Sequence, residues 1–151
     1  MKPLNLPTYS FNIKSDNDSR MIFDPCRLKW VALTPEEWVR QHIVKYLSED
    51  LKYPIGLIAT EMSIKLSSRT RRCDIVVHNR KGKAALIVEC KAPEISLNQD
   101  AFDQANRYNW ALGVPFLVIT NGMKHFCLER IENSFVFLNS FPYYERVDSQ
   151  S

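Results

Sequence analysis

The chain has 151 residues, of which 45% are hydrophobic and 25% charged, and a net charge of +3. This composition is that of a globular protein, and the length suits one domain over 1–151; we expect 1–20 and 148–151 to be mobile. No apolar run approaches the roughly 20 residues of a membrane-spanning helix, so a membrane protein is excluded. The four cysteines lack a C-x-x-C spacing, which argues against zinc and for reduced thiols in a cytoplasmic protein.

The N-terminal part predicts a strand arm followed by a helix. Residues 9–13 alternate apolar and polar, 20–23 return as a second strand, and 27–33 form a third after a turn at Asp24-Pro25. Thr34 is a suitable N-cap and Pro35 suits the first helical position. Glu37 completes a Thr-x-x-Glu capping box. Helical spacing then predicts a buried stripe of Val39, Ile43, Tyr46 and Leu47.

The middle of the chain predicts strands that meet in a hairpin. Residues 57–66 form a strand with its even-numbered positions on one face, and 67–72 form a polar turn. The apolar runs 75–77 and 84–88 flank a short loop and predict two paired strands. If Asn79 and Ala84 close this loop, Asp74 lies directly opposite Glu89.

The C-terminal part predicts a helix and further strands. The helix covers 97–113 and ends at Gly113; 114–120 then form a buried strand parallel to its neighbour. Asn121-Gly122 predicts a two-residue hairpin turn into 125–129, and 135–138 add a last strand before a frayed tail from Asp148. The expected fold class is therefore α/β, with a mixed β-sheet flanked by helices.

Two acids opposed at the end of an apolar hairpin favour a metal site. Asp74 and Glu89 would bind one or two Mg²⁺ ions, or Mn²⁺, with the backbone carbonyl of Cys90 as a further oxygen ligand. Lys91, two residues beyond Glu89 and on its face, would orient the attacking water. The alternatives are two solvated carboxylates at the strand rim, and an ordinary salt bridge between Lys91 and Glu89.

These residues carry a family resemblance. Asp74 followed by Glu89-Cys90-Lys91 matches the D…(D/E)-x-K pattern of the PD-(D/E)XK nuclease superfamily, with Cys73 in place of the usual proline. Together with the segments 33–41 and 118–122, the pattern resembles the N-terminal nuclease domain of the type I restriction enzyme R subunit over about residues 22 to 130.

The resemblance implies a restriction-endonuclease-like fold and a Mg²⁺-dependent deoxyribonuclease, an endonuclease of a restriction-modification system. DNA and other restriction-system subunits are the implied partners, and a homodimer is left open. The chain contains no P-loop motor sequence. Two alternatives remain: a non-catalytic module on the same fold that binds nucleic acid or a partner subunit, and a nuclease acting on RNA or branched DNA.

Other residues have candidate supporting roles. In related nucleases a glutamate on the first helix faces the metal, which would be Glu37 unless its capping box holds it; Glu61 competes for this role. The resemblance brings Gln104 to the active site, and Tyr108 shares its helix face, although both also suit a polar outer surface. Six cations would bind the DNA backbone, or merely form a solvated rim: Arg69, Arg71, Arg72, Arg80, Lys81 and Lys83.

Overall fold

The computed structural model describes residues 1–66, 69–100, 102–103 and 113–149. The strands in these ranges are β1 (Ile13–Asp16), β2 (Ser19–Asp24), β3 (Lys29–Ala32), β4 (Ile58–Leu66), β5 (Arg69–His78), β6 (Ala84–Cys90), β7 (Phe116–Thr120), β8 (His125–Ile131) and β9 (Ser134–Leu138). The helices are α1 (Pro35–Lys45), which continues into a π-helical turn (Tyr46–Asp50), a 3₁₀ turn (Ile55–Leu57) and α3 (Tyr144–Ser149). Among the described helices, none is long and apolar enough to cross a bilayer.

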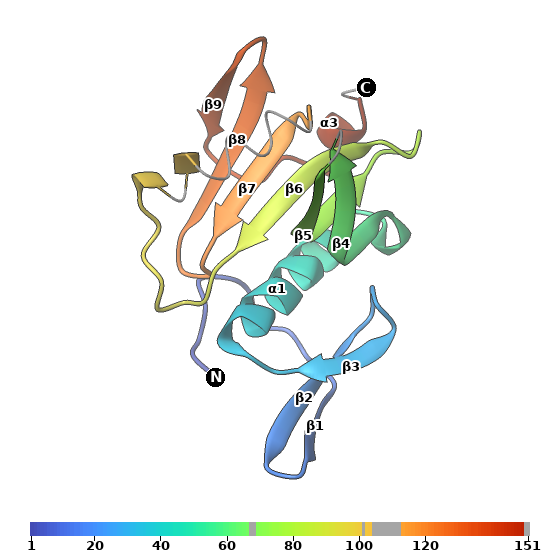
Figure 1. Ribbon diagram of the computed structural model, residues 1–151, viewed down its shortest axis with the longest axis vertical. Helices are drawn as coiled ribbons and strands as arrows, with labels where there is room; N and C mark the ends of the chain where they lie inside the picture. The colour runs from blue at the N-terminus through green and yellow to red at the C-terminus, as the bar shows by residue number, and fades with distance from the viewer. Residues whose placement is uncertain (67–68, 101, 104–112, 150–151) are drawn as a thin grey trace.

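The strands form two sheets on either side of α1. The larger sheet has the order β4-β5-β6-β7-β8-β9; its β6 and β7 are parallel and its other neighbours antiparallel. The smaller sheet, β1-β2-β3, is antiparallel and projects beyond α1, away from the larger sheet (Figure 1). The predicted mixed α/β architecture is confirmed, including the parallel pairing of β6 with β7. Most of the helix predicted over 97–113 lies outside the described residues.

Helix α1 packs on β5 and β6 through the predicted apolar stripe. Val39, Ile43 and Leu47 are completely buried there, whereas Tyr46 is half-buried at the edge of the cluster. Burial of such a stripe against a sheet supplies most of the stability of a short helix. The packing fixes the orientation of α1, and therefore the direction in which its polar residues point.

The β5–β6 hairpin has the predicted register up to Val77, but the predicted loop is wrong, because Ala84 pairs with His78 and not with Asn79. Ile75 pairs with Val88 and Val77 with Leu86, and a bulge follows at Val77/His78, where the loop begins. The Asn79 side chain holds this loop by accepting hydrogen bonds from the backbone N–H groups of Lys81 and Lys83. The next residues beyond the Ile75–Val88 pair are Asp74 and Glu89, so the hairpin brings the two acids to the same level of the sheet.

Several predicted boundaries near the N-terminus and in β5 are wrong. Residues 9–12 do not form a strand, since β1 begins at Ile13 and turns at Asn17 and Asp18, both with positive φ. The polar turn predicted over 67–72 is also too long, because β5 already begins at Arg69. Arg71 and Arg72 form ion pairs with Glu89 and Glu61 from within the strand, so their charge did not mark a turn.

The C-terminal half contains two further differences. The connection from β7 to β8 is a four-residue loop closed by the Thr120–His125 pair, rather than a two-residue turn at Asn121-Gly122. The Asn121 side chain accepts hydrogen bonds from the N–H groups of Met123 and Lys124 and so stabilises the longer loop. The prediction of a frayed tail is wrong for Asp148 and Ser149, which end helix α3, and residues 150–151 lie outside the described part of the chain. Helix α3 packs against β6, and its Asp148 pairs with Arg80.

The β4 strand also departs from simple alternation. Ile58 packs into the core beneath α1, whereas Met62 and Ile64 pack with the cluster of Cys73, Val76 and Ile87. The prediction that the even-numbered residues of this strand share one face is therefore wrong. The change occurs at Glu61, which has a φ of 51° in the middle of the strand. A left-handed non-glycine residue within a strand is strained and is typical of functional sites.

Candidate active site

Asp74 and Glu89 lie at the end of the β5–β6 hairpin that faces α1. The Oδ2 atom of Asp74 accepts a hydrogen bond of 2.8 Å from the Cys90 N–H, which ties the acid to the neighbouring strand. Glu89 forms an ion pair of 3.2 Å with Arg71. The side chains of Asp74 and Glu89 are only 13% and 14% exposed. Both acids are therefore held close to each other and largely away from water.

The proximity of the two acids perturbs Glu89. Burial, and after it the negative charge of Asp74, together raise the pKa of Glu89 to about 7 against the opposing effect of Arg71. Desolvation and a neighbouring like charge both disfavour ionisation of a carboxyl group. A cation placed between Asp74 and Glu89 would relieve this repulsion.

Lys91 lies directly beyond the end of β6. Its backbone N–H donates a hydrogen bond of 2.8 Å to the Thr120 carbonyl and so fixes the residue against the end of β7. Partial burial and the charge of Asp74 raise the pKa of Glu36, while Arg40 and Lys91 lower it. The Lys91 ammonium is thus within electrostatic reach of the acidic cluster, and it forms no salt bridge with any of the described residues.

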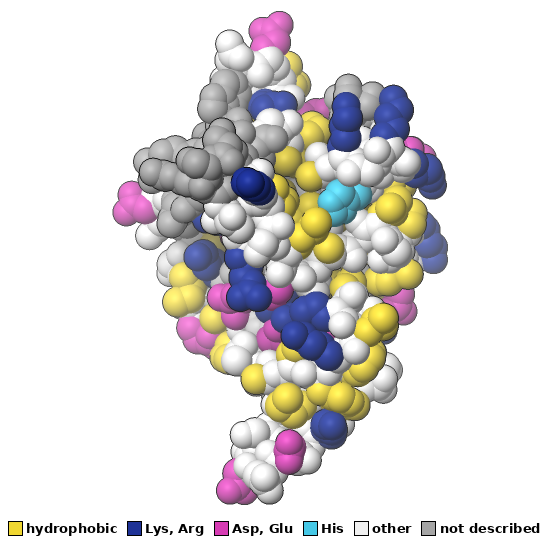
Figure 2. Space-filling view, turned by 45° about the vertical axis from the view of Figure 1, so that its right-hand side comes forward, with side chains coloured by type: hydrophobic (Ala, Val, Ile, Leu, Met, Phe, Trp, Pro, Cys, Tyr) yellow, Lys and Arg dark blue, Asp and Glu magenta, His cyan; other side chains and the backbone are white. Residues whose placement is uncertain are grey.

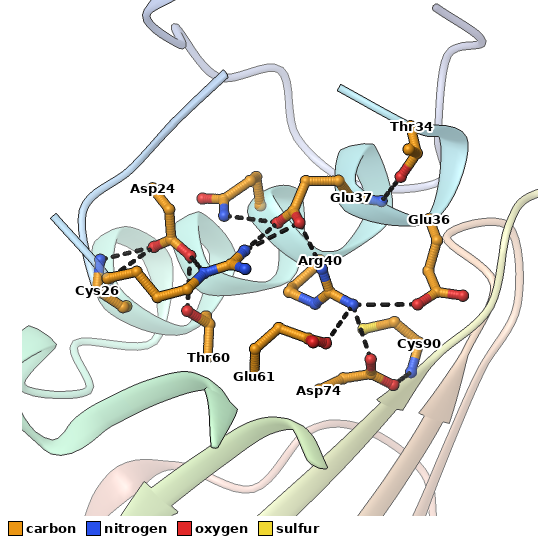
Figure 3. Close-up of polar contacts among 12 residues, drawn as sticks. Asp24, Cys26, Thr34, Glu36, Glu37, Arg40, Thr60, Glu61, Asp74 and Cys90 are labelled. Atoms are coloured by element: carbon orange, nitrogen blue, oxygen red, sulfur yellow. Dashed lines mark hydrogen bonds and ion pairs between the residues drawn. The ribbon is translucent and has the colours of Figure 1, made fainter. Parts of the chain in front are cut away.

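Arg40, on α1, is the residue at the centre of the site. Its Nη2 atom lies 2.8 Å from both Asp74 Oδ1 and Glu61 Oε1 and 3.0 Å from Glu36 Oε1 (Figure 3). Its Nη1 atom donates to Glu37. Burial alone would lower the pKa of Arg40, but the hydrogen bond to Asp74 and the charge of Glu37 raise it. The guanidinium therefore stays charged, although only 6% of the side chain is exposed.

Arg40 is not among the site residues predicted from the sequence. Its position offered a signal, because Arg40 lies on the buried stripe of α1, three residues before Ile43 and seven before Leu47. A cation at a core position of a helix requires buried acidic partners. Glu36 and Glu37, four and three residues earlier, supply two of them.

Glu37 does not complete a capping box. Thr34 Oγ1 accepts the Glu37 N–H at 3.0 Å, as predicted, but the Thr34 N–H donates to the Ala32 carbonyl. The Glu37 carboxylate instead accepts hydrogen bonds from Arg27, Arg40 and Gln41. Of the two predicted roles, capping is therefore wrong, and the carboxylate reaches Asp74 only through Arg40.

Glu61 lies nearer to the pair of acids than Glu37 does. Its carboxylate joins Arg40 at 2.8 Å and Arg72 at 3.1 Å. The positive φ of Glu61 turns this side chain toward α1 and away from the strand's regular alternation. Of the two glutamates proposed for a supporting role, Glu61 is the one that shares an Arg40 nitrogen with Asp74.

The predicted basic residues divide between the two ends of the hairpin. Arg71 and Arg72 join the site through Glu89 and Glu61. Arg80, Lys81 and Lys83 lie at the loop, six or more residues from Asp74, which is roughly 20 Å along a strand. Figure 2 shows Lys and Arg side chains beside Asp and Glu side chains across the middle of one face. Gln104, Tyr108 and the Arg69 side chain lie outside the described residues.

The donor atoms at this site fit a hard divalent cation. Asp74 and Glu89 supply carboxylate oxygens, and the Cys90 backbone supplies a carbonyl; Mg²⁺ often binds through one or two carboxylates and substrate phosphate. Complete burial raises the pKa of the Cys90 thiol, which therefore stays protonated and does not act as a ligand. In the part of the chain that the structure describes, no three His, Cys, Asp or Glu side chains are arranged as a metal-binding group.

The sheet order and the paired acids define a restriction-endonuclease-like fold. A solved structure of this fold is similar over 76% of the chain, with a TM-score of 0.55 and 19% identity: "The fragment structure of a putative HsdR subunit of a type I restriction enzyme from Vibrio vulnificus YJ016". The match covers 25% of that chain. Comparison with curated proteins finds no match.

The family follows from the sequence match. The model of the type I restriction enzyme R protein N terminus matches residues 35–142, which is most of the chain, and this protein belongs to that family. The match begins at the first residue of α1 and includes Arg40, Glu61, Asp74, Glu89 and Lys91. The small sheet β1-β2-β3 precedes the matched region.

Proposed function

We propose that this protein is a divalent-metal-dependent deoxyribonuclease domain that cuts DNA internally. The observation that carries the proposal is the placement of Asp74 and Glu89 side by side at the end of β5–β6, with Lys91 two residues beyond. Mg²⁺ or Mn²⁺ held by the two carboxylates and the Cys90 carbonyl would supply an activated water and neutralise charge on the phosphate.

The protein's own residues have distinct roles in this proposal. The Lys91 ammonium, fixed against β7 through its backbone, would orient the attacking water and stabilise negative charge that develops on the phosphate. Arg71 and Arg72, on the strand that leads to Asp74, would hold the DNA backbone without reading its sequence. DNA and the other subunits of a restriction system are the proposed partners, and a homodimer stays a prediction.

The second candidate is a non-catalytic module that binds DNA or a partner subunit. One observation favours it: both central acids already have guanidinium partners, Arg40 at Asp74 and Arg71 at Glu89. Acids that are permanently neutralised in this way would serve the fold rather than a metal. The two candidates therefore differ in whether a divalent cation binds at Asp74.

A plasmid assay distinguishes them. The wild-type protein and Lys91→Ala are incubated with supercoiled plasmid in Mg²⁺ or Mn²⁺, with Lys65→Ala, an exposed lysine on β4, as the matched control. We expect nicking by the wild type and the control and a loss of roughly 100-fold or more in Lys91→Ala. Equal nicking by all three removes Lys91 from the mechanism. Absence of nicking, together with absence of Mn²⁺ binding, favours the module.

The same assay tests the nature of the substrate. Branched DNA and RNA of matched length are added to separate reactions. Preferential cleavage of either one would support the corresponding alternative over duplex DNA.

A further inference from the structure

Arg40 occupies the position at which a cation is needed. Its Nη2 atom contacts three carboxylates from three elements: Glu36 on α1, Glu61 on β4 and Asp74 on β5. A guanidinium nitrogen carries two hydrogens, so it cannot donate a well-directed hydrogen bond to all three acceptors at once. The contact is therefore mainly one of charge, as it would be for an ion.

The surroundings hold Arg40 from its other side. Nη1 donates to Glu37, whose carboxylate is fixed in turn by both a bidentate contact with Arg27 at 2.9 Å and a hydrogen bond from Gln41. Arg27 is anchored to the buried Asp24 in the turn between β2 and β3. The guanidinium would remain attached to Glu37 if its contacts with Asp74 and Glu61 were lost.

Arg40 is also incompletely satisfied. Its Nε atom is buried and has no hydrogen-bond partner among the residues that the structure describes. Arginine in a purely structural network normally has its donors paired, because an unpaired buried donor destabilises the fold. The orphaned Nε indicates that the position of this side chain is fixed by the charge around it.

The charges around Arg40 do not balance. Among the described residues, ion pairs and the contact between Glu89 and Asp74 connect six carboxylates with four guanidinium groups: Asp24, Glu36, Glu37, Glu61, Asp74 and Glu89, with Arg27, Arg40, Arg71 and Arg72. Lys91 adds one further positive charge near Glu36. Among the described residues the acids therefore exceed the cations by one when Glu89 is ionised, and a cation bound there would favour that ionised form.

We infer that Arg40 is a positioning residue that acts as the resident counter-cation of Asp74 and Glu61 and competes with the divalent metal for them. The inference rests on the proposed function. Arg40 keeps the acids together in the metal-free protein, and it weakens metal binding because the metal must share or replace its contacts. Metal affinity in the absence of DNA is then set by Arg40, and substrate phosphate is needed to complete tight binding.

Calorimetric titration of Mn²⁺ into the chelator-treated full chain at about pH 8 tests the inference. Removing a positive charge next to the ligands should strengthen binding, so we expect Arg40→Gln to bind Mn²⁺ at least about tenfold more tightly than the wild type. Arg40→Lys retains the charge and should stay within about threefold of the wild type. Arg80→Gln is the matched control, because its charge lies at the loop end of the hairpin and pairs with Asp148.

Thermal unfolding supplies a second readout. Without metal, Arg40→Gln leaves Asp74, Glu61 and Glu36 to repel one another and should melt below the wild type. Saturating Mn²⁺ should raise its melting temperature by more than it raises that of the wild type, because ligand stabilisation grows with affinity. A purely structural arginine would lower the melting temperature to the same extent with and without Mn²⁺.

The outcomes separate this inference from the proposed function. If neither the wild type nor any variant binds Mn²⁺, or if Asp74→Asn binds as the wild type does, the proposed metal site fails. If binding depends on Asp74 but folded Arg40→Gln binds no more tightly than the wild type, only the role of Arg40 is overturned. Should Arg40→Gln not fold, the double variant Glu36→Gln/Arg40→Gln is compared with Glu36→Gln, and the same increase in affinity is required.

Discussion

Helix α1 lies between two groups of carboxylates: Asp24 on one side, and Asp74 with Glu89 on the other. Hydrogen-bond donors and positive charges neutralise these two groups to very different degrees. Asp24 is completely buried and accepts hydrogen bonds from Thr60, from the Arg27 side chain and from two backbone N–H groups. Burial would raise the pKa of Asp24, but the bonds from Thr60 and Arg27 outweigh burial and lower it. Glu89 is nearly as hidden, yet its pKa is raised to about 7.

The difference assigns different roles to the two groups. At Asp24 every lone pair that burial removes from water is replaced by a donor, so the charge stabilises the fold. At Asp74 and Glu89 two acids face each other with too few donors, which costs stability unless a cation binds. In the function proposed above, that cation is the divalent metal.

The largest effect is expected from Asp24→Asn. The substitution leaves Arg27 without its buried charged partner and disturbs the contact of Arg27 with Glu37, so unfolding free energy should fall by about 3–5 kcal/mol. Urea denaturation measures the loss. Asp16→Asn, at the exposed end of β1, is the control and should change stability by less than about 0.5 kcal/mol. A loss below about 1 kcal/mol for Asp24→Asn would contradict the structural role of this acid.

A smaller effect is expected from Thr60→Val, which has nearly the same shape. The hydroxyl donates a hydrogen bond of 2.6 Å to Asp24 Oδ2, and its removal should reduce unfolding free energy by about 1.5–3 kcal/mol. Thr70→Val, exposed on β5, controls for the change in strand propensity. Equal stability of the two variants would mean that Asp24 does not need this donor.

Glu89→Gln should raise the free energy of unfolding, whereas the two substitutions above should lower it. Because the folded-state pKa of Glu89 lies above its usual value, the folded protein binds more protons than the unfolded chain between about pH 5 and 7, and wild-type stability falls as pH rises through that window. The amide does not titrate. In chelator-treated protein, Glu89→Gln should therefore equal the wild type near pH 5 and exceed it by about 1–2 kcal/mol near pH 8.

Urea denaturation at the two pH values measures this gap, with the exposed Glu94→Gln as the control. A gap that stays constant from pH 5 to pH 8 would show that Glu89 ionises normally. The comparison between the two groups of acids would then lose its basis, because both would be compensated equally.

The sequence predicted those parts of the site that depend on residues close together in the chain, namely the β5–β6 hairpin and the start and buried face of α1. The two apolar runs of the β5–β6 hairpin placed Asp74 near Glu89 correctly, although their loop closes at the His78–Ala84 pair after a register shift at Val77/His78 that the sequence did not predict. The Thr34 cap and the stripe of α1 likewise depend on spacing within a few residues. Each of these features can be derived from the period of a helix or a strand.

The features that could not be predicted depend on residues far apart in the chain. Arg40 forms a hydrogen bond with Asp74, which lies 34 positions later in the chain. The Glu37 carboxylate accepts a hydrogen bond from Arg27, which lies ten positions earlier, in a turn. The capping-box pattern cannot reveal that a distant guanidinium takes the carboxylate. The left-handed Glu61 is also invisible in the sequence, because an ordinary glutamate within an apolar-polar alternation predicts a regular strand.

The smallest effect is expected from the ion pair of Lys45 with Glu49, which serves as a reference for the contrast between Asp24 and Glu89. Lys45 and Glu49, with side chains 31% and 55% exposed, form an ion pair of 3.2 Å at the end of α1. Glu49→Gln should reduce unfolding free energy by only about 0.3–0.5 kcal/mol at low salt, and 1 M salt should abolish the difference. Urea denaturation of wild type and variant at both salt concentrations measures it. A loss above about 1 kcal/mol would mean that exposed ion pairs are unusually strong in this protein. The difference between the lowered pKa of Asp24 and the raised pKa of Glu89 would then arise from how many charged partners each acid has. It would not arise from whether hydrogen-bond donors of the protein replace the water lost on burial.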